Sequence, residues 1–271
     1  MSSAVRELAP IASPQLDRFR LMMRFQRACA WSGAACITIF IGGFALAGFI
    51  PPLHADDSAA AVARHYRDHQ VMIQLGGLCF IVAGMFYAAF TGVISAQMAR
   101  IEGVHRSVHY VQLAAGAFGC LTYLVPGLFL EIAAFRVDRP DETIQLLNDM
   151  FWILAVMPWP PFLTQNWAFA WAILADGRAP SLFPRWLAYL NVWAPLAFAP
   201  SVLLPFFLHG PFAWHGAFVL WIPAVVFILQ FAANVTCLLR AIADEEAAGP
   251  PGAGGPPDHG AAPSAVAGAV A

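Results

Sequence analysis

Six long stretches of the sequence are apolar and almost free of charge, and they restrict the possible folds more than any other feature. They cover residues 29–50, 71–99, 108–130, 150–175, 186–208 and 214–239. About 20 apolar residues are enough for a helix to cross the hydrocarbon core of a bilayer. Backbone amides and carbonyls find no water in lipid, so such stretches must form helices. The sequence therefore predicts an all-α, polytopic membrane protein with a bundle of six transmembrane helices.

The composition agrees with a lipid environment. Hydrophobic residues make up 60% of the chain and charged residues only 11%, whereas a soluble domain carries about 25% charged residues. So few charges could not cover so much apolar surface in water. None of the six stretches shows the polar residue at every second position that a membrane barrel requires.

The arginines predict the orientation in the membrane. The chain has 14 basic residues, none of them lysine, and ten arginines fall on the side of the N-terminus in a six-helix layout. Because positively charged loops stay in the cytoplasm, both termini are expected there, in a bacterial inner membrane. Residues 1–28 are then a basic cytoplasmic segment, and residues 241–271, rich in Ala, Gly and Pro, a disordered cytoplasmic tail. The net charge of −2 gives no basic surface for nucleic acid.

The two larger outer loops are each expected to hold a short interfacial helix. Ser58 is a good N-cap for a helix over residues 59–70. In the second loop, Pro140 is followed by Asp141 and Glu142, acids that favour a helix N-terminus. Both short helices are predicted to run directly into the membrane-spanning helices that follow.

The fourth apolar stretch carries the strongest indication of a binding site. Pro158, Pro160 and Pro161 remove amide donors, so the helix should kink or break there. Gln165 and Asn166 follow within about one turn, and transporters often build sites from an interrupted helix with nearby polar groups. The candidate ligand-binding residues are Gln165 and Asn166 as hydrogen-bonding groups, Trp159, Trp167 and Trp171 as apolar walls, and Asn191 and Glu131. The alternative is that the amides only join neighbouring helices and the prolines only shape the bundle.

Glu131 is the one carboxylate attached to an apolar stretch, near the outer end of the third. The favoured interpretation is pairing with Arg136, Arg139 or a hydrogen-bond donor of the loop. The alternative is a coupling role for protons or cations, which carboxylates in membranes often have.

Two histidines one turn apart, His65 and His69, share a helix face with Asp68. Two imidazoles at this spacing are half of a zinc site, and paired histidines can also ligate haem. His54, His209 and His215 are expected on the same side of the membrane. Because no longer metal-binding signature is present, the favoured interpretation is an interfacial helix cap without a cofactor, with metal or haem binding as the alternative.

Three functions remain open from the sequence. The favoured one is binding or transport of a small, largely apolar molecule at the proline-broken fourth helix. The second is a membrane-bound metal- or haem-dependent enzyme, although no catalytic template or nucleophile is recognisable. The third is an accessory subunit that docks a partner helix on the small residues Gly84, Ala88 and Gly92.

Overall fold

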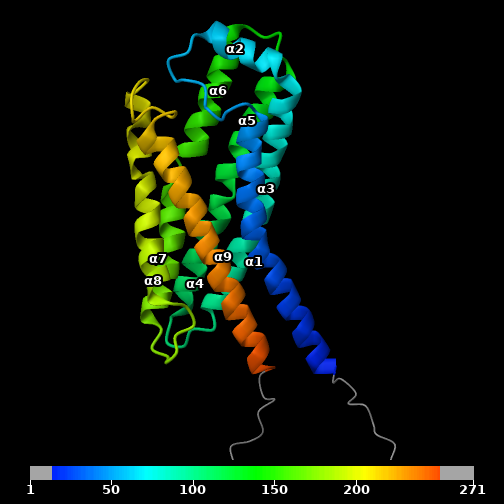
Figure 1. The fold of residues 1–271 in the computed structure, drawn as a ribbon, viewed down its shortest axis with the longest axis vertical. Helices are drawn as coiled ribbons and strands as arrows, with labels where there is room; N and C mark the ends of the chain where they lie inside the picture. The colour runs from blue at the N-terminus through cyan, green and yellow to red at the C-terminus, as the bar shows by residue number, and fades with distance from the viewer. Residues whose placement is uncertain (1–13, 251–271) are drawn as a thin grey trace, which may run out of the picture.

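Long helices run back and forth between the two ends of an elongated bundle (Figure 1). The computed structural model describes residues 14–250, and within this range every regular element is helical, which confirms the all-α prediction. The elements are α1 (Pro14–Leu46), α2 (Ala59–Asp68), α3 (Gln70–Met98), α4 (Arg106–Gly119), α5 (Leu121–Phe135), α6 (Asp141–Val156), α7 (Pro160–Ala175), α8 (Arg185–Trp193), the 3₁₀ helix η1 (Ala194–Phe206), the π-helical turn η2 (Ala217–Trp221) and α9 (Ile222–Ala248).

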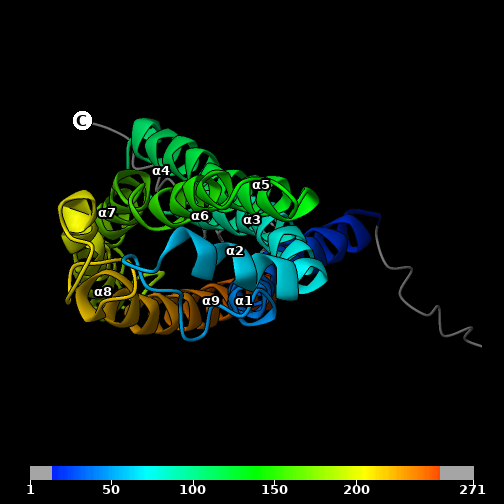
Figure 2. The ribbon, with the colours of Figure 1, turned by 90° about the horizontal axis from the view of Figure 1, so that it is seen from above.

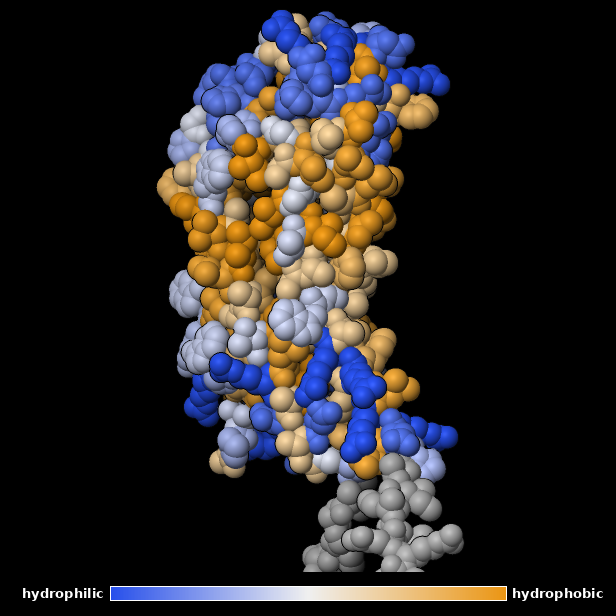
Figure 3. Space-filling model, turned by 45° about the vertical axis from the view of Figure 1, so that its right-hand side comes forward, coloured by the Kyte–Doolittle hydropathy of each residue, from blue (hydrophilic) through white to orange (hydrophobic). Residues whose placement is uncertain are grey.

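Five helical segments of the described chain are long and apolar enough to cross a membrane. They are Pro14–Leu46, Gln70–Met98, Arg106–Phe135, Arg185–Phe206 and Ala217–Ala248. A band of hydrophobic surface lies between two hydrophilic ends of the molecule (Figure 3). These helices are therefore compatible with an integral membrane protein in contact with lipid. The predicted fourth span is not among the five because its helix is interrupted between Val156 and Pro160.

The first and last helices reach further towards the terminal end of the bundle than the predicted spans. α1 begins at Pro14, inside the predicted N-terminal segment 1–28, and α9 continues through residues 241–248, inside the predicted disordered tail. The helix continues because Ile242 is fully buried and Glu246 pairs with Arg27 of α1. Residues 1–13 and 251–271 of the two predicted segments lie outside the described residues.

Helix α2 lies across the end of the bundle opposite the two termini (Figures 1 and 2). Ser58 caps it, accepting a hydrogen bond from the Ala61 amide at 3.3 Å. The predicted direct continuation into the next helix is wrong, because His69 leaves the helical conformation at φ −120°, ψ 22°. Contacts with α6 hold α2 in its transverse position: the Tyr66 hydroxyl donates to Asn148 Oδ1 at 3.2 Å, and Arg67 Nη2 binds Asp141 Oδ1 at 2.6 Å.

Close helix contacts depend on glycines at two positions of α3. A Cβ atom on Gly76 of α3 would lie 2.7 Å from the carbonyl oxygen of Gly43 in α1. A Cβ atom on Gly77 would lie 3.0 Å from the carbonyl oxygen of Gly127 in α5. Because glycine has no side chain, the helix backbones can approach closely at these positions, as is common between membrane helices.

The small residues predicted to dock a partner helix do not share one free surface. Gly84 faces α5 of the same chain, since a Cβ there would lie 3.3 Å from Cys120 O. Ala88 is exposed, and the space beside Gly92 is open to 4 Å. These small residues are therefore divided between internal helix packing and the outer surface.

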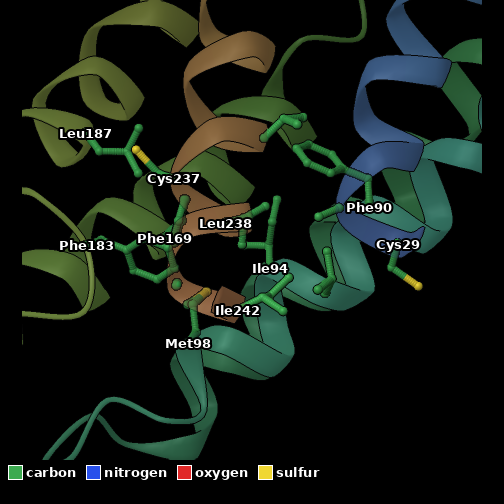
Figure 4. Packing of buried hydrophobic residues seen from close by; sticks show 14 of the residues in the cluster. Cys29, Phe90, Ile94, Met98, Phe169, Phe183, Leu187, Cys237, Leu238 and Ile242 are labelled. Atoms are coloured by element: carbon green, nitrogen blue, oxygen red, sulfur yellow. The ribbon is translucent and has the colours of Figure 1, made fainter. Parts of the chain in front are cut away.

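Two clusters of buried side chains form the core. The cluster near the termini joins α1, α3, α7, α8 and α9, and Figure 4 shows Met98, Phe169, Phe183 and Ile242 of this cluster pointing toward one another. The second cluster lies towards α2 and includes Tyr66, Phe80, Phe151, Trp152 and Trp214. Phe40 of α1 packs against both clusters, and the candidate site lies beside it.

Candidate functional site

An apolar cavity of about 300 Å³ lies beside the interruption between α6 and α7. Most elements of the bundle contribute to its lining, including Phe40 and Phe44 of α1, Tyr123 of α5, Phe162 of α7 and Phe227 of α9. Many of these rings meet edge to face, among them Phe40 with Tyr123 at 5.0 Å and Phe162 with Phe227 at 5.3 Å between centroids. Such packing gives the cavity rigid apolar walls.

The three prolines of the fourth apolar stretch create the interruption, as the sequence predicts. α6 ends at Val156 and α7 begins at Pro160. Because Pro158 and Pro160 have no amide hydrogen, the carbonyls of Leu154 and Val156 lose their usual helical partners. The Met157 carbonyl instead accepts from the Trp159 amide at 2.8 Å. Val156, Pro158 and Trp159 all line the cavity.

Trp159 lines the cavity, and its indole Nε1 is buried without a hydrogen-bond partner among the described residues. An indole nitrogen can only donate. Leaving a buried donor unsatisfied costs about 1–3 kcal/mol. An oxygen acceptor on a ligand would recover part of that free energy once the Trp159 ring turns its Nε1 towards the cavity.

Gln165 belongs to a polar network between α3, α4 and α7. Its Oε1 accepts from the Tyr87 hydroxyl, and its Nε2 donates to Thr91 Oγ1 at 2.9 Å. Gln112 Nε2 also donates to Thr91 Oγ1, at 3.0 Å. The four side chains are buried, so these bonds join the three helices away from water and lipid.

Asn166 begins a second chain of amides, which extends through α8 and α9. Gln230 Nε2 donates to Asn166 Oδ1 at 2.6 Å and to Asn191 Oδ1 at 2.9 Å. Asn191 Nδ2 donates to Asn234 Oδ1 at 2.9 Å, and Asn234 Nδ2 donates back to Asn191 Oδ1 at 3.2 Å. Gln165 and Asn166 are adjacent in α7, so the two groups lie side by side, and together they are called the buried amide network below.

The structure does not bring the predicted ligand-binding amides to the cavity wall. Gln165 and Asn166 are only 4% and 5% exposed and bind other helices, as in the alternative interpretation from the sequence. The network nevertheless lies next to the cavity: Tyr87 lines the cavity and bonds Gln165, and Asn166 Nδ2 donates to the carbonyl of Phe162, another lining residue, at 2.6 Å.

Of the three tryptophans predicted as walls, only Trp159 lines the cavity. Trp167 and Trp171 lie on the outer face of α7, 45% and 67% exposed. Residues 165, 166, 167 and 171 cannot all lie on one face of a helix. Because the amides of residues 165 and 166 face inward, the two tryptophans face outward. Trp167 Nε1 donates instead to the Val192 carbonyl at 3.2 Å.

Glu131 makes none of the predicted ion pairs among residues 14–250. Arg139 Nη1 donates to the Ile132 carbonyl at 2.7 Å, and Oε1 of Glu131 is buried without a hydrogen-bond partner in the described part of the chain. The carboxyl group lies over Gly77, where a Cβ atom would approach Oε1 to 2.6 Å. Glu131 is thus part of the contact between α3 and α5 and does not line the cavity.

The predicted metal ligands His65, Asp68 and His69 do not converge as a group of three. His65 Nε2 donates to the Ala47 carbonyl at 2.9 Å, and its ring stacks on Phe49 at 5.6 Å. His69 Nδ1 donates to the His65 carbonyl at 3.1 Å. Burial lowers the pKa of His65 below its usual 6.5. These contacts agree with a helix cap that packs on the end of the bundle.

A different group of possible ligands converges at the same end. Within residues 14–250, the group is His54, Asp56 and His215, whose ligand atoms all lie within 4.8 Å of one another. His209 is adjacent, with Nδ1 3.1 Å from Asp56 Oδ2.

Sequence reasoning missed Tyr87, Thr91, Gln112 and Gln230 as members of the network. Gln230 had the clearest signal, because it is an amide in an apolar stretch and precedes Asn234 by four residues, on the same helix face. Tyr87 and Thr91 also lie four residues apart. The four-residue spacing was visible in the sequence, but the hydrogen-bond partners of these side chains lie on other helices and could not be identified from it.

Comparison with protein-family models, curated proteins and solved structures found no match to the chain. The site must therefore be interpreted from its own geometry.

Proposed function

We propose that the chain crosses the membrane six times, with α6 and α7 together forming the fourth crossing. In support, the beginning of α1 and the end of α9 lie at the same end of the bundle, which requires an even number of crossings (Figure 1). The short gap from 157 to 159 is only partly exposed and lies beside the cavity, and irregular backbone is tolerated where it lines a cavity.

The proposed orientation places the two described ends in the cytoplasm of a bacterium. Nine described arginines belong to the terminal end and four to the other, which fits the rule that positive loops remain inside. The nine are Arg18, Arg20, Arg24, Arg27, Arg100, Arg106, Arg178, Arg185 and Arg240, and the four are Arg64, Arg67, Arg136 and Arg139.

Within this layout, the function we infer is the binding or passage of a small, largely apolar molecule that carries a hydrogen-bond acceptor. The observation that carries this inference is the apolar cavity, whose lining includes Trp159 with its unsatisfied indole Nε1. The volume of about 300 Å³ lies at the lower bound for small-molecule sites, which are mostly apolar with few polar groups.

Lipid is the natural source of such a ligand. Ile50 of the loop after α1 and Val225 of α9 line the cavity and are also 51% and 57% exposed on the outer surface. α1 and α9 diverge towards the α2 end of the bundle (Figure 1). An apolar molecule could therefore enter between these helices without crossing water.

Mass spectrometry of small molecules retained by the full chain after mild detergent purification tests the proposal. Ala224→Trp fills the cavity from α9, whereas Leu229→Trp adds the same ring to an exposed position of that helix. We expect one molecule to be retained by the wild type and by Leu229→Trp, and lost from Ala224→Trp.

Trp159→Phe removes the donor and keeps an aromatic ring. It should weaken binding about 3- to 10-fold, since a hydrogen bond contributes about 0.5–1.5 kcal/mol. Equal retention by Ala224→Trp and the wild type would refute the proposed cavity.

A further inference from the structure

Three histidines and an aspartate from two distant loops meet at the α2 end of the bundle. His54 and Asp56 belong to the connection between α1 and α2, and His209 and His215 to the connection between η1 and η2. Two hydrogen bonds hold these loops together: Trp214 Nε1 donates to the Leu53 carbonyl at 2.8 Å, and the Ala55 amide donates to His215 Nδ1 at 3.1 Å.

We propose that this cluster binds one zinc ion, with His54, Asp56 and His215 as ligands and His209 as the fourth. Imidazole nitrogens and a carboxylate oxygen are common zinc ligands in tetrahedral sites. Nitrogen-rich sites also disfavour Mg²⁺ and Ca²⁺, which prefer oxygen.

The distances require only small movements to complete the site. Ligand atoms in a tetrahedral zinc site lie about 3.4 Å apart, given bonds of about 2.0–2.2 Å. His209 Nδ1 already lies 3.1 Å from Asp56 Oδ2, and His54 Nδ1 lies 3.8 Å from Asp56 Oδ1. The side chains of His54 and His209 are 63% and 74% exposed, so both can turn without displacing packed neighbours.

The present arrangement of the rings also shows which contacts zinc must replace. His54 and His215 stack with their centroids 4.3 Å apart and their planes at 14°. A metal lies near the plane of each imidazole that binds it, so the His54 ring must rotate out of the stack. Zinc must also displace the Ala55 amide from His215 Nδ1, or the ring must turn and present Nε2.

A bound ion would tie together two loops that border the cavity. Phe49 and Ile50 of the first loop line the cavity, and Leu220 and Trp221 line it just after the second loop. The inference does not rest on the proposed apolar ligand, because zinc binding can be measured without it.

Zinc titration of the metal-free full chain in detergent, followed by calorimetry, tests the site. We expect one Zn²⁺ per chain for the wild type. Loss of a residue that only hydrogen-bonds to a metal ligand already weakens metal affinity about 10–100-fold. The double variant His54→Ala/His215→Ala removes two direct ligands, so it should bind zinc at least about 100-fold more weakly. His65→Ala/His69→Ala removes two histidines at the same end of the bundle and should bind like the wild type.

A single variant and a thermal measurement keep the proposal testable if the double variant folds poorly. The single variant His54→Ala changes an exposed side chain, and it should lose at least about 10-fold in affinity. Zinc should raise the unfolding temperature of the wild type and of the His65/His69 control, and raise it less for His54→Ala. Absence of zinc binding by the wild type, or equal affinity of the His54→Ala chain, would overturn the proposal.

Discussion

Asn191 occupies the centre of the buried amide network, and its replacement tests whether the network stabilises the bundle. Asn191→Leu keeps a similar volume and removes both polar groups. Three bonds to α9 would be lost: those with Gln230 Nε2 at 2.9 Å, Asn234 Oδ1 at 2.9 Å and Asn234 Nδ2 at 3.2 Å. The remaining bond, to the Leu187 carbonyl, lies within α8.

The expected magnitude follows from the three interhelical bonds. Polar bonds between membrane helices contribute about 0.6 kcal/mol each on average and at most about 1.7 kcal/mol. The free energy of unfolding should therefore fall by about 2 kcal/mol. The loss cannot be recovered from water, because Asn234 and Gln230 are buried.

Unfolding of the detergent-solubilised chain in increasing dodecyl sulfate, followed by tryptophan fluorescence, measures this change. Thr236→Val is the matched control on α9, since the Thr236 hydroxyl is exposed and binds only the Ala232 carbonyl of its own helix. The control should change stability by less than about 0.5 kcal/mol. An Asn191→Leu protein as stable as this control would refute the idea that the network holds α8 against α9.

Three further predictions concern other parts of the fold. Gly76→Ala should cost about 1–3 kcal/mol in the same assay because its Cβ would meet the α1 backbone, whereas Gly92→Ala faces open space and should not destabilise; equal effects would contradict the close contact. Asp176→Asn should cost about 2 kcal/mol at neutral pH, since hydrogen bonds from Arg178 hold the pKa of Asp176 at about 2. This difference should shrink as the pH falls from 3.8 towards 2, and a constant difference would contradict it. Burial lowers the pKa of His65 in the folded chain, so His65 is protonated at a higher pH in the unfolded chain than in the folded one. The unfolding temperature should therefore fall as the pH drops below 6.5, and His65→Gln should reduce this decrease. A decrease of the same size in the His65→Gln chain would show that His65 does not cause it.

The local breaks in the helices could be predicted from the sequence because their causes are local. Pro158 and Pro160 remove particular amide donors whatever surrounds them, so the interruption between α6 and α7 follows from the chain alone. The all-helical architecture likewise follows from the length of the apolar stretches, since lipid leaves the backbone no other partner.

The partners of the polar side chains could not be predicted in this way. Gln165 lies next to a predicted break, but its bonds to Tyr87 and Thr91 depend on how α3 and α7 are rotated. The convergence of His54 with His215 depends on two loops far apart in the chain. The failure of α2 to continue into α3 has the same origin, because α2 is held by Tyr66 and its contact with α6.

The prolines of η1 change how far a given number of residues can reach. A 3₁₀ helix rises about 2.0 Å per residue and an α-helix about 1.5 Å. The 13 residues of η1 thus extend over about 26 Å instead of about 20 Å. α8 and η1 together measure about 40 Å, well beyond a hydrocarbon thickness of about 30 Å. In the proposed layout this surplus length would carry His209 clear of the lipid, and a relaxation of this segment to ordinary helix would draw its loop about 6 Å back towards the bilayer.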